Sequence, residues 1–452
     1  MVKEYGFDIS ILDKYSGLAE KNNKIEAEYY SMYNVKRGLR NSNGTGVLVG
    51  LTKVGDVTGY IIENDVKVPT EGKLIYRGID VEKIVEGFQQ EKRFGFEEVS
   101  YLLLFGELPC KKELQEFKEL LGSCRTLPEG FLEDMILRAP SKDIMNKLER
   151  SVLVSYSYDP NPDDISINNV LRQSIELMSR FPAMIAYGYQ AKAHYYSGKS
   201  LFIHSPLPEL STAENILHMI RNDNGYTSTE AEILDLSMVL HAEHGGGNNS
   251  TFATHVVSST GTDTYSAIAA AVGALKGPKH GGANIKVMEM IADIKDNIRK
   301  WDNREELENY LRKILRKDAF DGSGLIYGMG HAVYTISDPR AELLKKKAKE
   351  LAAEKNRMEE YELYRSIEEI TKCIFAEAEA NRKIAANVDF YSGFVYDMLN
   401  IPQELYTPLF ATARIPGWCA HRIEQLASEP KIIRPAYRSV KEEEHYCELD
   451  KR

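Results

Sequence analysis

The chain has 452 residues, of which 43% are hydrophobic and 27% are charged, a composition typical of folded globular proteins. The 67 Asp and Glu residues outnumber the 57 Lys and Arg residues, so the formal net charge is −10. This balance argues against a broad surface for nucleic acid or anionic membranes, but it is compatible with a local cationic pocket for a small anionic substrate. At about 150 residues per domain, the length predicts two or three domains, or one large core with a smaller lobe.

Cysteine usage and the first residues bear on the cellular compartment. The five cysteines form no Cys-x-x-Cys pair, and such a sparse, odd set is more typical of reduced thiols than of a disulfide framework. The N-terminus lacks the apolar core of a signal peptide, and no apolar run approaches the roughly 18 residues that a membrane span needs. We therefore expect a cytoplasmic protein with no membrane partner.

The N-terminal part is expected to hold helices and then strands. Helix-like stretches cover residues 10–18 and 24–33, and a loop follows at 41–46. Alternating apolar residues and turn dipeptides then predict a small set of strands or hairpins. The strands are expected at 47–51, 58–62 and 73–77, and the turns at 55–56, 64–65 and 71–72.

After Gly78 the chain is expected to be mostly helical. Apolar residues on most sides predict core helices at 233–240 and 266–275, whereas dense charge around a narrow apolar stripe predicts surface helices at 304–316 and 341–355. No linker rich in Pro, Gly or Ser separates these segments. A second domain is therefore expected to be an insertion into the first.

Three histidines lie beside glycines in otherwise helical sequence: His244, His280 and His331. Glycine costs about 0.5–1 kcal/mol inside regular structure, so such clusters indicate close backbone approach or an unusual conformation. The alternative is a glycine-rich turn with a bystander histidine. His280 lies between two predicted helices, close to the N-terminus of the second, where the helix dipole favours the neutral imidazole. A neutral imidazole can donate a hydrogen bond to a carbonyl oxygen that becomes an enolate.

One carboxylate and three arginines have unusual neighbours. Asp389 lies among Val388, Phe390 and Tyr391, and a carboxylate in apolar surroundings is a stronger base. The alternative is that Asp389 caps a helix over 390–399. Three arginines complete the candidate set, since guanidinium groups bind carboxylates bidentately, although surface ion pairing is the common alternative. They are Arg340, Arg414 and Arg434.

At this point the residues resemble a known family. The segments HGGAN at 280–284, GMGHAV at 328–333 with DPR at 338–340, and NVDFYSG at 387–393 are similar to three signature segments of the citrate synthase family, in the family's order. Two further segments, HAEHGGGN at 241–248 and ARIPGW at 413–418, resemble others, and LIYRG at 74–78 resembles the family's early strand and turn. The resemblance spans roughly residues 45–440. Gly245 stands where the family often has Glu.

The resemblance implies a mainly α-helical homodimer with a small N-terminal β element. Residues 1–285 and 401–452 would form the large domain, and 286–400 a small, mobile domain on the CoA side. The implied reaction, part of the tricarboxylic acid cycle, condenses acetyl-CoA with oxaloacetate and hydrolyses the thioester to citrate and CoA. Acetyl-CoA is then a substrate, and neither a cofactor nor a metal is implied.

The resemblance also implies a role for each matching residue. Asp389 would remove a proton from the acetyl methyl group, His280 would stabilise the enolate, and His331 would polarise the oxaloacetate carbonyl and protonate the alkoxide. Four residues would bind oxaloacetate, the last from the neighbouring subunit: His244, Arg340, Arg414 and Arg434. Five positions would contact CoA: Leu325, Ile326, Gly328, Gly330 and Asn387.

Several alternatives stay open. A 2-methylcitrate synthase, with propionyl-CoA as donor, would share every one of these residues. A metal hydrolase is suggested by the H-x-E pattern of His241 and Glu243, but the P-C-x-x-C partner of zinc deaminases and any HExxH motif are missing. Residues 322–328 miss a dinucleotide-binding G-x-G-x-x-G by one position. A non-catalytic helical scaffold would leave His280, Asp389 and Arg414 replaceable.

Overall fold

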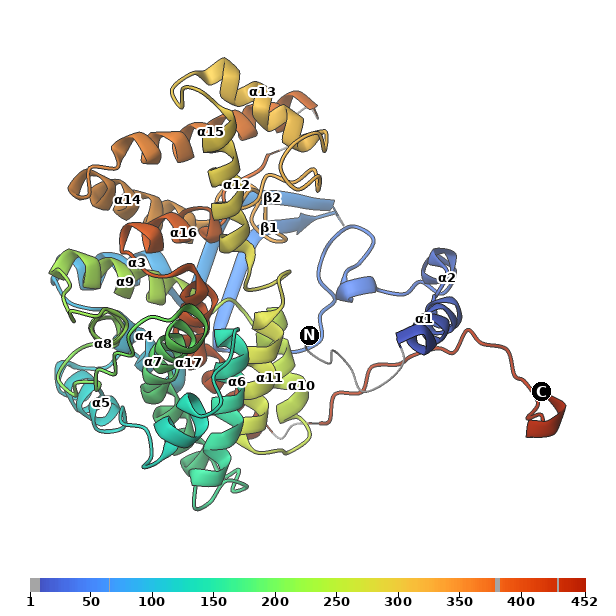
Figure 1. Cartoon of the computed structure of the whole chain (residues 1–452), viewed down its shortest axis with the longest axis horizontal. Helices are drawn as coiled ribbons and strands as arrows, with labels where there is room; N and C mark the ends of the chain where they lie inside the picture. Colours follow the sequence, from blue (N-terminus) through green and yellow to red (C-terminus); the bar gives the residue numbers. More distant parts are fainter. Residues whose placement is uncertain (1–8, 65, 379–382, 429–430) are drawn as a thin grey trace. The chain divides into compact units, whose positions relative to one another are not determined.

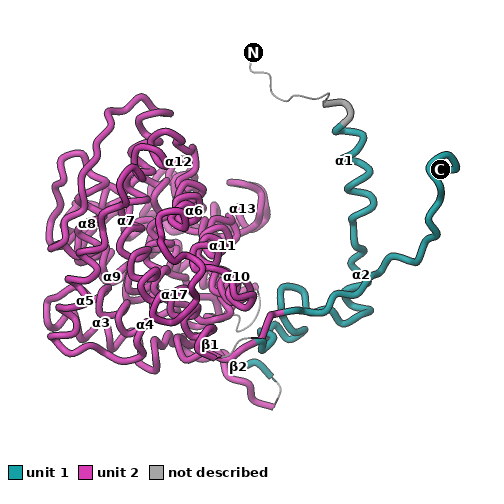
Figure 2. The backbone as a smooth tube through the Cα atoms, turned by 90° about the horizontal axis from the view of Figure 1, so that it is seen from below, with its two compact units in different colours: residues 1–49, 65–67, 434–452 teal, residues 50–64, 68–433 magenta. Residues whose placement is uncertain are grey.

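The computed structural model describes residues 9–64, 66–378, 383–428 and 431–452. Two compact units are distinguished in Figure 2, unit 1 with residues 1–49, 65–67 and 434–452 and unit 2 with residues 50–64 and 68–433. The expected domain boundaries at 286 and 400 both lie inside unit 2 and stay a prediction. In the described ranges no helix is long and apolar enough to cross a membrane.

Unit 1 contains the N-terminal helices that the sequence predicts. They are α1 (Ile9–Asn23) and α2 (Ala27–Met32), accompanied by the short 3₁₀ turns η1 (Arg37–Leu39) and η5 (Leu449–Lys451). Large apolar side chains of this unit are exposed: Leu48 is 85%, Tyr437 96% and Tyr446 84% exposed. One copy of the chain therefore leaves apolar surface uncovered in this unit.

The β element is a three-stranded sheet with the order β1-β2-β3. Its strands are β1 (Gly55–Glu63), β2 (Val66–Tyr76) and β3 (Ile79–Asp80). Strands β2 and β3 are antiparallel, with Tyr76 opposite Ile79. Arg77 and Gly78 connect them with φ values of 47° and 86°, the left-handed conformation at both central residues that a tight hairpin requires. The predicted strands at 58–62 and 73–77 are thus confirmed, the second up to Tyr76.

Three expectations in this region are wrong. Residues 47–51 form no strand, and Leu51 is 90% exposed, because an alternating pattern makes a strand only where a neighbouring strand accepts its hydrogen bonds. Residues 55–56 begin β1 instead of forming a turn. Gly72 lies inside β2, where a Cβ atom would be 2.2 Å from the backbone oxygen of Ser337, so glycine serves close approach here. Part of the turn expected at 64–65 lies outside the described residues.

The rest of unit 2 is helical, so the mainly α fold is confirmed. Figure 1 shows α12 to α16 grouped together, with the other long helices of the unit beside them. The helices are α3 (Val81–Gln90), α4 (Phe96–Phe105), α5 (Lys111–Ser123), η2 (Phe131–Leu137), α6 (Ile144–Ser155), η3 (Tyr156–Tyr158), α7 (Ile167–Ser197), α8 (Thr212–Ile220), α9 (Ser228–His241), α10 (Asn249–Ser258), α11 (Thr264–Lys276), α12 (Ala283–Asn297), α13 (Arg304–Leu315), α14 (Pro339–Glu354), α15 (Met358–Ala378), α16 (Val388–Met398), η4 (Gln403–Leu405) and α17 (Tyr406–Ala427).

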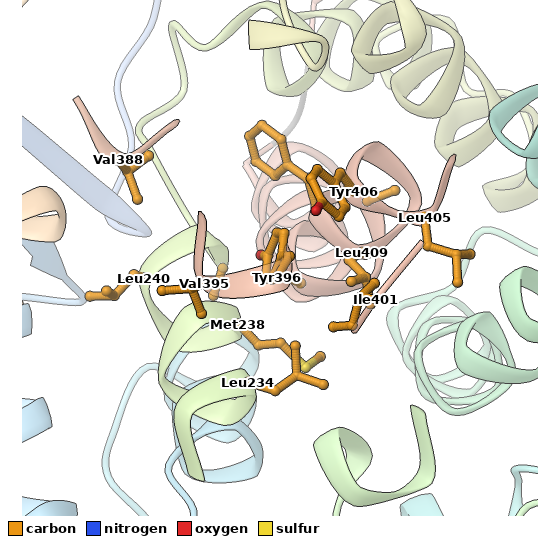
Figure 3. Packing of buried hydrophobic residues seen from close by; sticks show 14 of the residues in the cluster. Leu234, Met238, Leu240, Val388, Val395, Tyr396, Ile401, Leu405, Tyr406 and Leu409 are labelled. Carbon is orange, nitrogen blue, oxygen red and sulfur yellow. The ribbon is translucent and has the colours of Figure 1, made fainter. Parts of the chain in front are cut away.

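Core packing brings the ends of three helices together. Every residue of α17 from Tyr406 to Arg422 is buried, so this helix runs through the centre of the unit. In Figure 3, Leu240 at the end of α9 lies beside Val395 of α16, and Tyr396 of the same helix lies near Leu409 of α17. All four side chains are buried. These apolar contacts place the C-terminal ends of α9 and α16 and the N-terminal part of α17 in one region.

The close approach at Gly72 is open to test. We expect Gly72→Ala to lower the free energy of unfolding by about 1–3 kcal/mol, because its methyl group overlaps the Ser337 carbonyl, which cannot move freely. Gly87→Ala in α3 is the matched control. No atom lies within 4 Å of its added Cβ, so helix propensity should raise stability by up to about 1 kcal/mol. Urea unfolding followed by circular dichroism measures both, and equal stabilities of the Gly72 variant and the parent would contradict the contact.

Candidate active site

His244 lies just after α9, in a segment fastened to the sheet. The hydroxyl of Tyr76 on β2 donates to the backbone oxygens of Val239 (2.9 Å) and Glu243 (3.2 Å). Gly245 follows with φ of 79°, which a residue with a side chain adopts only with strain. His244 is buried, and within the described chain its Nε2 has no hydrogen-bond partner. Burial and the charges of Arg340 and His331 hold its pKa well below the usual value, so its imidazole is neutral.

A short backbone bridge joins the His331 segment to the Asp389 segment. Gly330 N donates to Ala385 O (2.7 Å), and Asn387 N donates to Gly328 O (2.9 Å). The side chain of Asn387 adds a bond from Nδ2 to Gly330 O at 3.0 Å. Two segments more than fifty residues apart are thereby held in register. These backbone contacts hold the segments that carry His331 and Asp389 next to each other.

The ring of His331 is oriented by its own turn. Its Nδ1 accepts from the backbone N–H groups of Val333 (3.1 Å) and Tyr334 (3.2 Å). In the neutral imidazole the proton is therefore on Nε2, which makes Nε2 a donor. The ring is stacked on Tyr334, with 4.9 Å between centroids, and meets His244 edge to face at 5.2 Å.

Asp389 is the second residue of α16 and does not cap it. The N-cap is Asn387, whose Oδ1 accepts from Asp389 N at 3.0 Å. The alternative interpretation of Asp389 as an N-cap is therefore wrong, and its carboxylate is not used to cap the helix. Burial raises the pKa of Asp389 to about 6, against the opposing charges of Arg340 and Arg414.

Arg340 and Arg414 are both buried but differ in their partners. Arg340 forms a bidentate pair with Asp338, with Nε–Oδ1 3.0 Å and Nη2–Oδ2 2.7 Å. Arg414, fully buried in α17, donates from Nε to His241 O at 2.5 Å, and its guanidinium lies 4.8 Å from the ring centre of Phe410. In the described residues neither Nη1 nor Nη2 of Arg414 has a partner. Desolvation lowers the pKa of Arg414 to about 10, so the group is still a cation at neutral pH.

His280 lies in the turn between α11 and α12, as expected. Burial, followed by the charge of Arg414, lowers the pKa of His280 to about 4, which agrees with the neutral imidazole that the sequence predicts. Its Nε2 lies 3.1 Å from Ser250 Oγ, which also accepts from Trp418 Nε1 at 3.1 Å. The Ser250 hydroxyl proton can point to His280 Nε2 or to Asn248 Oδ1, 2.9 Å away.

Sequence reasoning missed the groups that connect these residues. The ring of Phe410 lies between His241 (4.8 Å), His280 (6.1 Å) and the guanidinium of Arg414. Because Phe410 and Arg414 are four residues apart on one helix, their spacing could have indicated a shared face. No pattern in the sequence indicates that Ser250 contacts His280.

The positions expected to contact CoA lie in the loop before α14 and at the start of α16. Leu325 is 55% exposed and Ile326 is buried, while Gly328 and Gly330 have φ values of 79° and 92°. Both polar ends of the Asn387 side chain are engaged by the backbone contacts described above. The role of these five residues toward CoA stays a prediction.

Arg434 is not brought to this site within unit 2. It belongs to unit 1, where it is exposed, and its predicted role stays a prediction. His241, the other histidine of its segment, donates from Nδ1 to Ser237 O at 2.7 Å inside the helix end. Among the residues with described positions, no group of three or more His, Cys, Asp or Glu side chains could hold a metal ion.

The chain matches the family described as "Citrate synthase, C-terminal domain" over residues 43–436. A citrate synthase of Haloferax volcanii is 35% identical over 416 residues, which cover 91% of this chain and 97% of that protein. The 2-methylcitrate synthase 1 of Corynebacterium glutamicum is 34% identical over 418 residues, with coverage of 91% and 97%.

Solved structures agree with these relatives. The citrate synthase of Thermoplasma acidophilum, in a ternary complex with carboxymethyl coenzyme A and oxaloacetate, has a TM-score of 0.76 at 26% identity, covering 92% of this chain and 99% of that chain. The citrate synthase of Pyrobaculum aerophilum has a TM-score of 0.73 at 29% identity, covering 90% and 94%. The resemblance read from the sequence motifs is confirmed: the chain belongs to the citrate synthase family.

Proposed function

We propose that the protein is a citrate synthase that condenses acetyl-CoA with oxaloacetate and hydrolyses the thioester to citrate and CoA. The observation that carries this proposal is the buried Arg414, whose two terminal nitrogens have no partner in the described chain, in reach of the charge of Asp389. Buried guanidinium donors without partners are unfavourable, so the site is built for an anionic ligand. Oxaloacetate, with two carboxylates, supplies that charge.

Oxaloacetate binding uses the cations and the histidines together. Under the proposal, Arg414 binds one carboxylate through Nη1 and Nη2, and Arg340 and Arg434 contribute to the carboxylate contacts. The unpartnered Nε2 of the neutral His244 binds the substrate by hydrogen bonding. The donor at Nε2 of His331 polarises the ketone oxygen, which its tautomer supports.

The carbon–carbon bond forms in two proton-coupled steps. Asp389 takes a proton from the acetyl methyl group, and its raised pKa makes it a better base than an exposed Asp. The developing enolate oxygen receives a hydrogen bond from His280, whose Nε2 is engaged by Ser250, so that Nδ1 is the donor when the Ser250 proton points to Nε2. The enolate carbon then attacks the ketone carbon, and His331 gives the Nε2 proton to the new alkoxide.

Hydrolysis of the resulting citryl thioester completes the reaction. Water adds to the thioester carbonyl, the C–S bond breaks, and citrate and CoA leave with net release of one proton. The proposal includes no metal and no cofactor, because imidazole and guanidinium groups supply the electrostatic stabilisation. We place the enzyme in the cytoplasm on the pattern of its cysteines, all five of which are free thiols.

We also propose a homodimer in which Arg434 reaches the oxaloacetate site of the neighbouring subunit. The exposed apolar side chains of unit 1, Tyr437 among them, support an interface near this residue. Mixing Asp389→Asn with Arg434→Leu protein should then restore part of the lost activity, since mixed dimers contain one site with both native residues. Mixtures no more active than their components would contradict the shared site.

Asp389→Asn is the sharpest test of the chemistry. We expect kcat to fall by about 10²–10⁴-fold, the range that a general base contributes, because the amide cannot accept the methyl proton. Thiol release from acetyl-CoA in the presence of oxaloacetate measures the rate. An unchanged kcat would remove Asp389 from the mechanism.

The pKa of Asp389 adds a signed expectation. In the parent, kcat/KM should fall tenfold per pH unit below about pH 6, as the base becomes protonated. Because the pKa in the folded protein is raised, the stability contributed by the protonated form is lost as pH rises through about 6. The Asn variant should therefore be more stable than the parent at pH 8, and this advantage should shrink at pH 5 in thermal unfolding.

Arg414 and Arg422 form a matched pair of buried arginines on α17. Arg414→Leu should raise KM for oxaloacetate at least tenfold without loss of stability, because the native guanidinium has two unpartnered nitrogens. Arg422→Leu should destabilise the fold, since Arg422 donates to Ser258 Oγ, Thr262 O and Thr264 Oγ1 at 2.7–3.1 Å. An unaltered KM for Arg414→Leu would contradict its role as a carboxylate clamp.

A 2-methylcitrate synthase is the second candidate, because one of the similar relatives bears that name at 34% identity. One methylene in a pocket contributes about 1–3 kcal/mol to discrimination, or roughly 10–200-fold in kcat/KM. We expect acetyl-CoA to be preferred over propionyl-CoA in steady-state assays with oxaloacetate. The opposite preference would assign the second activity.

A further inference from the structure

One face of α17 contacts residues next to His280 and residues next to His244. Trp418 donates to Ser250, the partner of His280, as described above. Three or four residues further along the helix, His421 contacts Glu243, and Gln425 contacts His255. Residues at this spacing share one face of a helix. The stripe that begins with Arg414 therefore continues into a second layer of polar groups.

The centre of this layer is the carboxylate of Glu243. Its side chain is fully buried, and its Oε1 accepts from His421 Nε2 at 2.8 Å and from Gly245 N at 2.6 Å. Glu243 immediately precedes His244, and Gly245 immediately follows it. The carboxylate thus closes a tight loop of backbone around the proposed oxaloacetate-binding histidine.

Neighbouring side chains orient the ring of His421, which donates to Glu243. Because His421 Nε2–H donates to the carboxylate, His421 Nδ1 is an acceptor in the neutral ring. His255 Nε2 lies 3.2 Å from that Nδ1, and Gln425 Oε1 lies 2.8 Å from His255 Nδ1, from which it accepts. Side-chain contacts thus connect Gln425, both imidazoles and Glu243 without a gap. Each member fixes the ring of the next.

Two glycines keep the carboxylate in place sterically. A Cβ atom at Gly55 would lie 2.7 Å from Glu243 Cγ, and one at Gly417 would lie 2.5 Å from its Oε2. The carboxylate therefore fills the space that these residues leave, and little room for another rotamer exists between them.

Glu243 also compensates part of the charge of Arg414. Its carboxylate favours the protonated guanidinium but does not hydrogen-bond to Nη1 or Nη2. The charge of Arg414 is thus partly offset while its two terminal nitrogens are left for a ligand. A direct salt bridge, such as the one Arg340 makes with Asp338, would occupy those nitrogens instead.

We propose that Glu243 and His421 are positioning residues for the oxaloacetate site: the carboxylate of Glu243, oriented by His421, holds the His244 loop in its binding conformation and leaves the terminal nitrogens of Arg414 available. This inference rests on the proposed function. It adds the two residues that make that site ready before the substrate arrives.

The test compares two replacements of His421. Gln places an amide N–H near the position of Nε2 and can still donate to Glu243, whereas Leu fills space without a donor. We expect His421→Leu to raise both KM and the calorimetric Kd for oxaloacetate at least tenfold, with a smaller change in KM for acetyl-CoA. His421→Gln should stay within about threefold of the parent for all three quantities.

A buried carboxylate elsewhere in unit 2 serves as the control. Asp159 accepts from Arg172 (2.7 and 2.8 Å), Gln173 and Tyr265 and contacts no residue of the site. Asp159→Asn should lower the melting temperature without changing the Kd for oxaloacetate. An equal rise in Kd for this variant would show that general destabilisation explains the effect, and the inference would fall.

A second variant covers the case in which His421→Leu does not fold. The double variant Glu243→Gln with His421→Leu removes the charge together with its partner, so no unpaired carboxylate is buried. It should fold and still bind oxaloacetate at least tenfold more weakly. A folded Leu-containing variant with Kd within twofold of the parent, or a Gln variant as weak as the Leu variant, would overturn the inference alone. A parent that neither binds oxaloacetate nor releases CoA would overturn the proposed function itself.

Discussion

The site depends on a buried cation that the protein leaves partly unsatisfied. Arg414 is completely buried in a central helix, and its only hydrogen bond in the described chain is from Nε to a backbone oxygen. Removing a charge from water without pairing it costs several kcal/mol, so the surrounding core must stabilise an arrangement that is unfavourable by itself. Burial of α17 from Tyr406 to Arg422 provides that support. An anion that enters the site recovers the missing interactions.

The rest of the constellation is held by backbone contacts more than by side chains. The bridge between 328–330 and 385–387 sets the spacing of the His331 and Asp389 segments, and Tyr76 fastens the His244 segment to the sheet. Side chains mounted on such contacts lose little conformational entropy when a ligand binds. Catalytic geometry of this kind is preorganised before the substrate arrives.

Sequence patterns were sufficient for the long helices and for the family, but not for the groups that surround the candidate residues. The spacing of the segments around His280, His331 and Asp389 identified the family, and the turn containing His280 lies where helix patterns end. Gly72 was misinterpreted as a turn because close approach to Ser337, 265 residues away, is a tertiary constraint that leaves no local pattern. Glu243 was considered only as part of an H-x-E pattern, because its contacts in β1 and α17 are far away in the sequence and no local spacing relates them.

The electrostatics of the empty and the occupied site are linked. Arg340 and Arg414 both oppose the rise in the pKa of Asp389 that burial causes. Carboxylates of oxaloacetate placed on these guanidiniums would cancel much of that opposition, since a neutralised cation no longer favours the ionised form of its neighbour. Asp389 would then become a stronger base once the acceptor substrate is in place. Under the proposed function, the arginines that bind oxaloacetate thus keep the base weaker in its absence, so that proton removal from the acetyl group is favoured when an electrophile is present to capture the enolate.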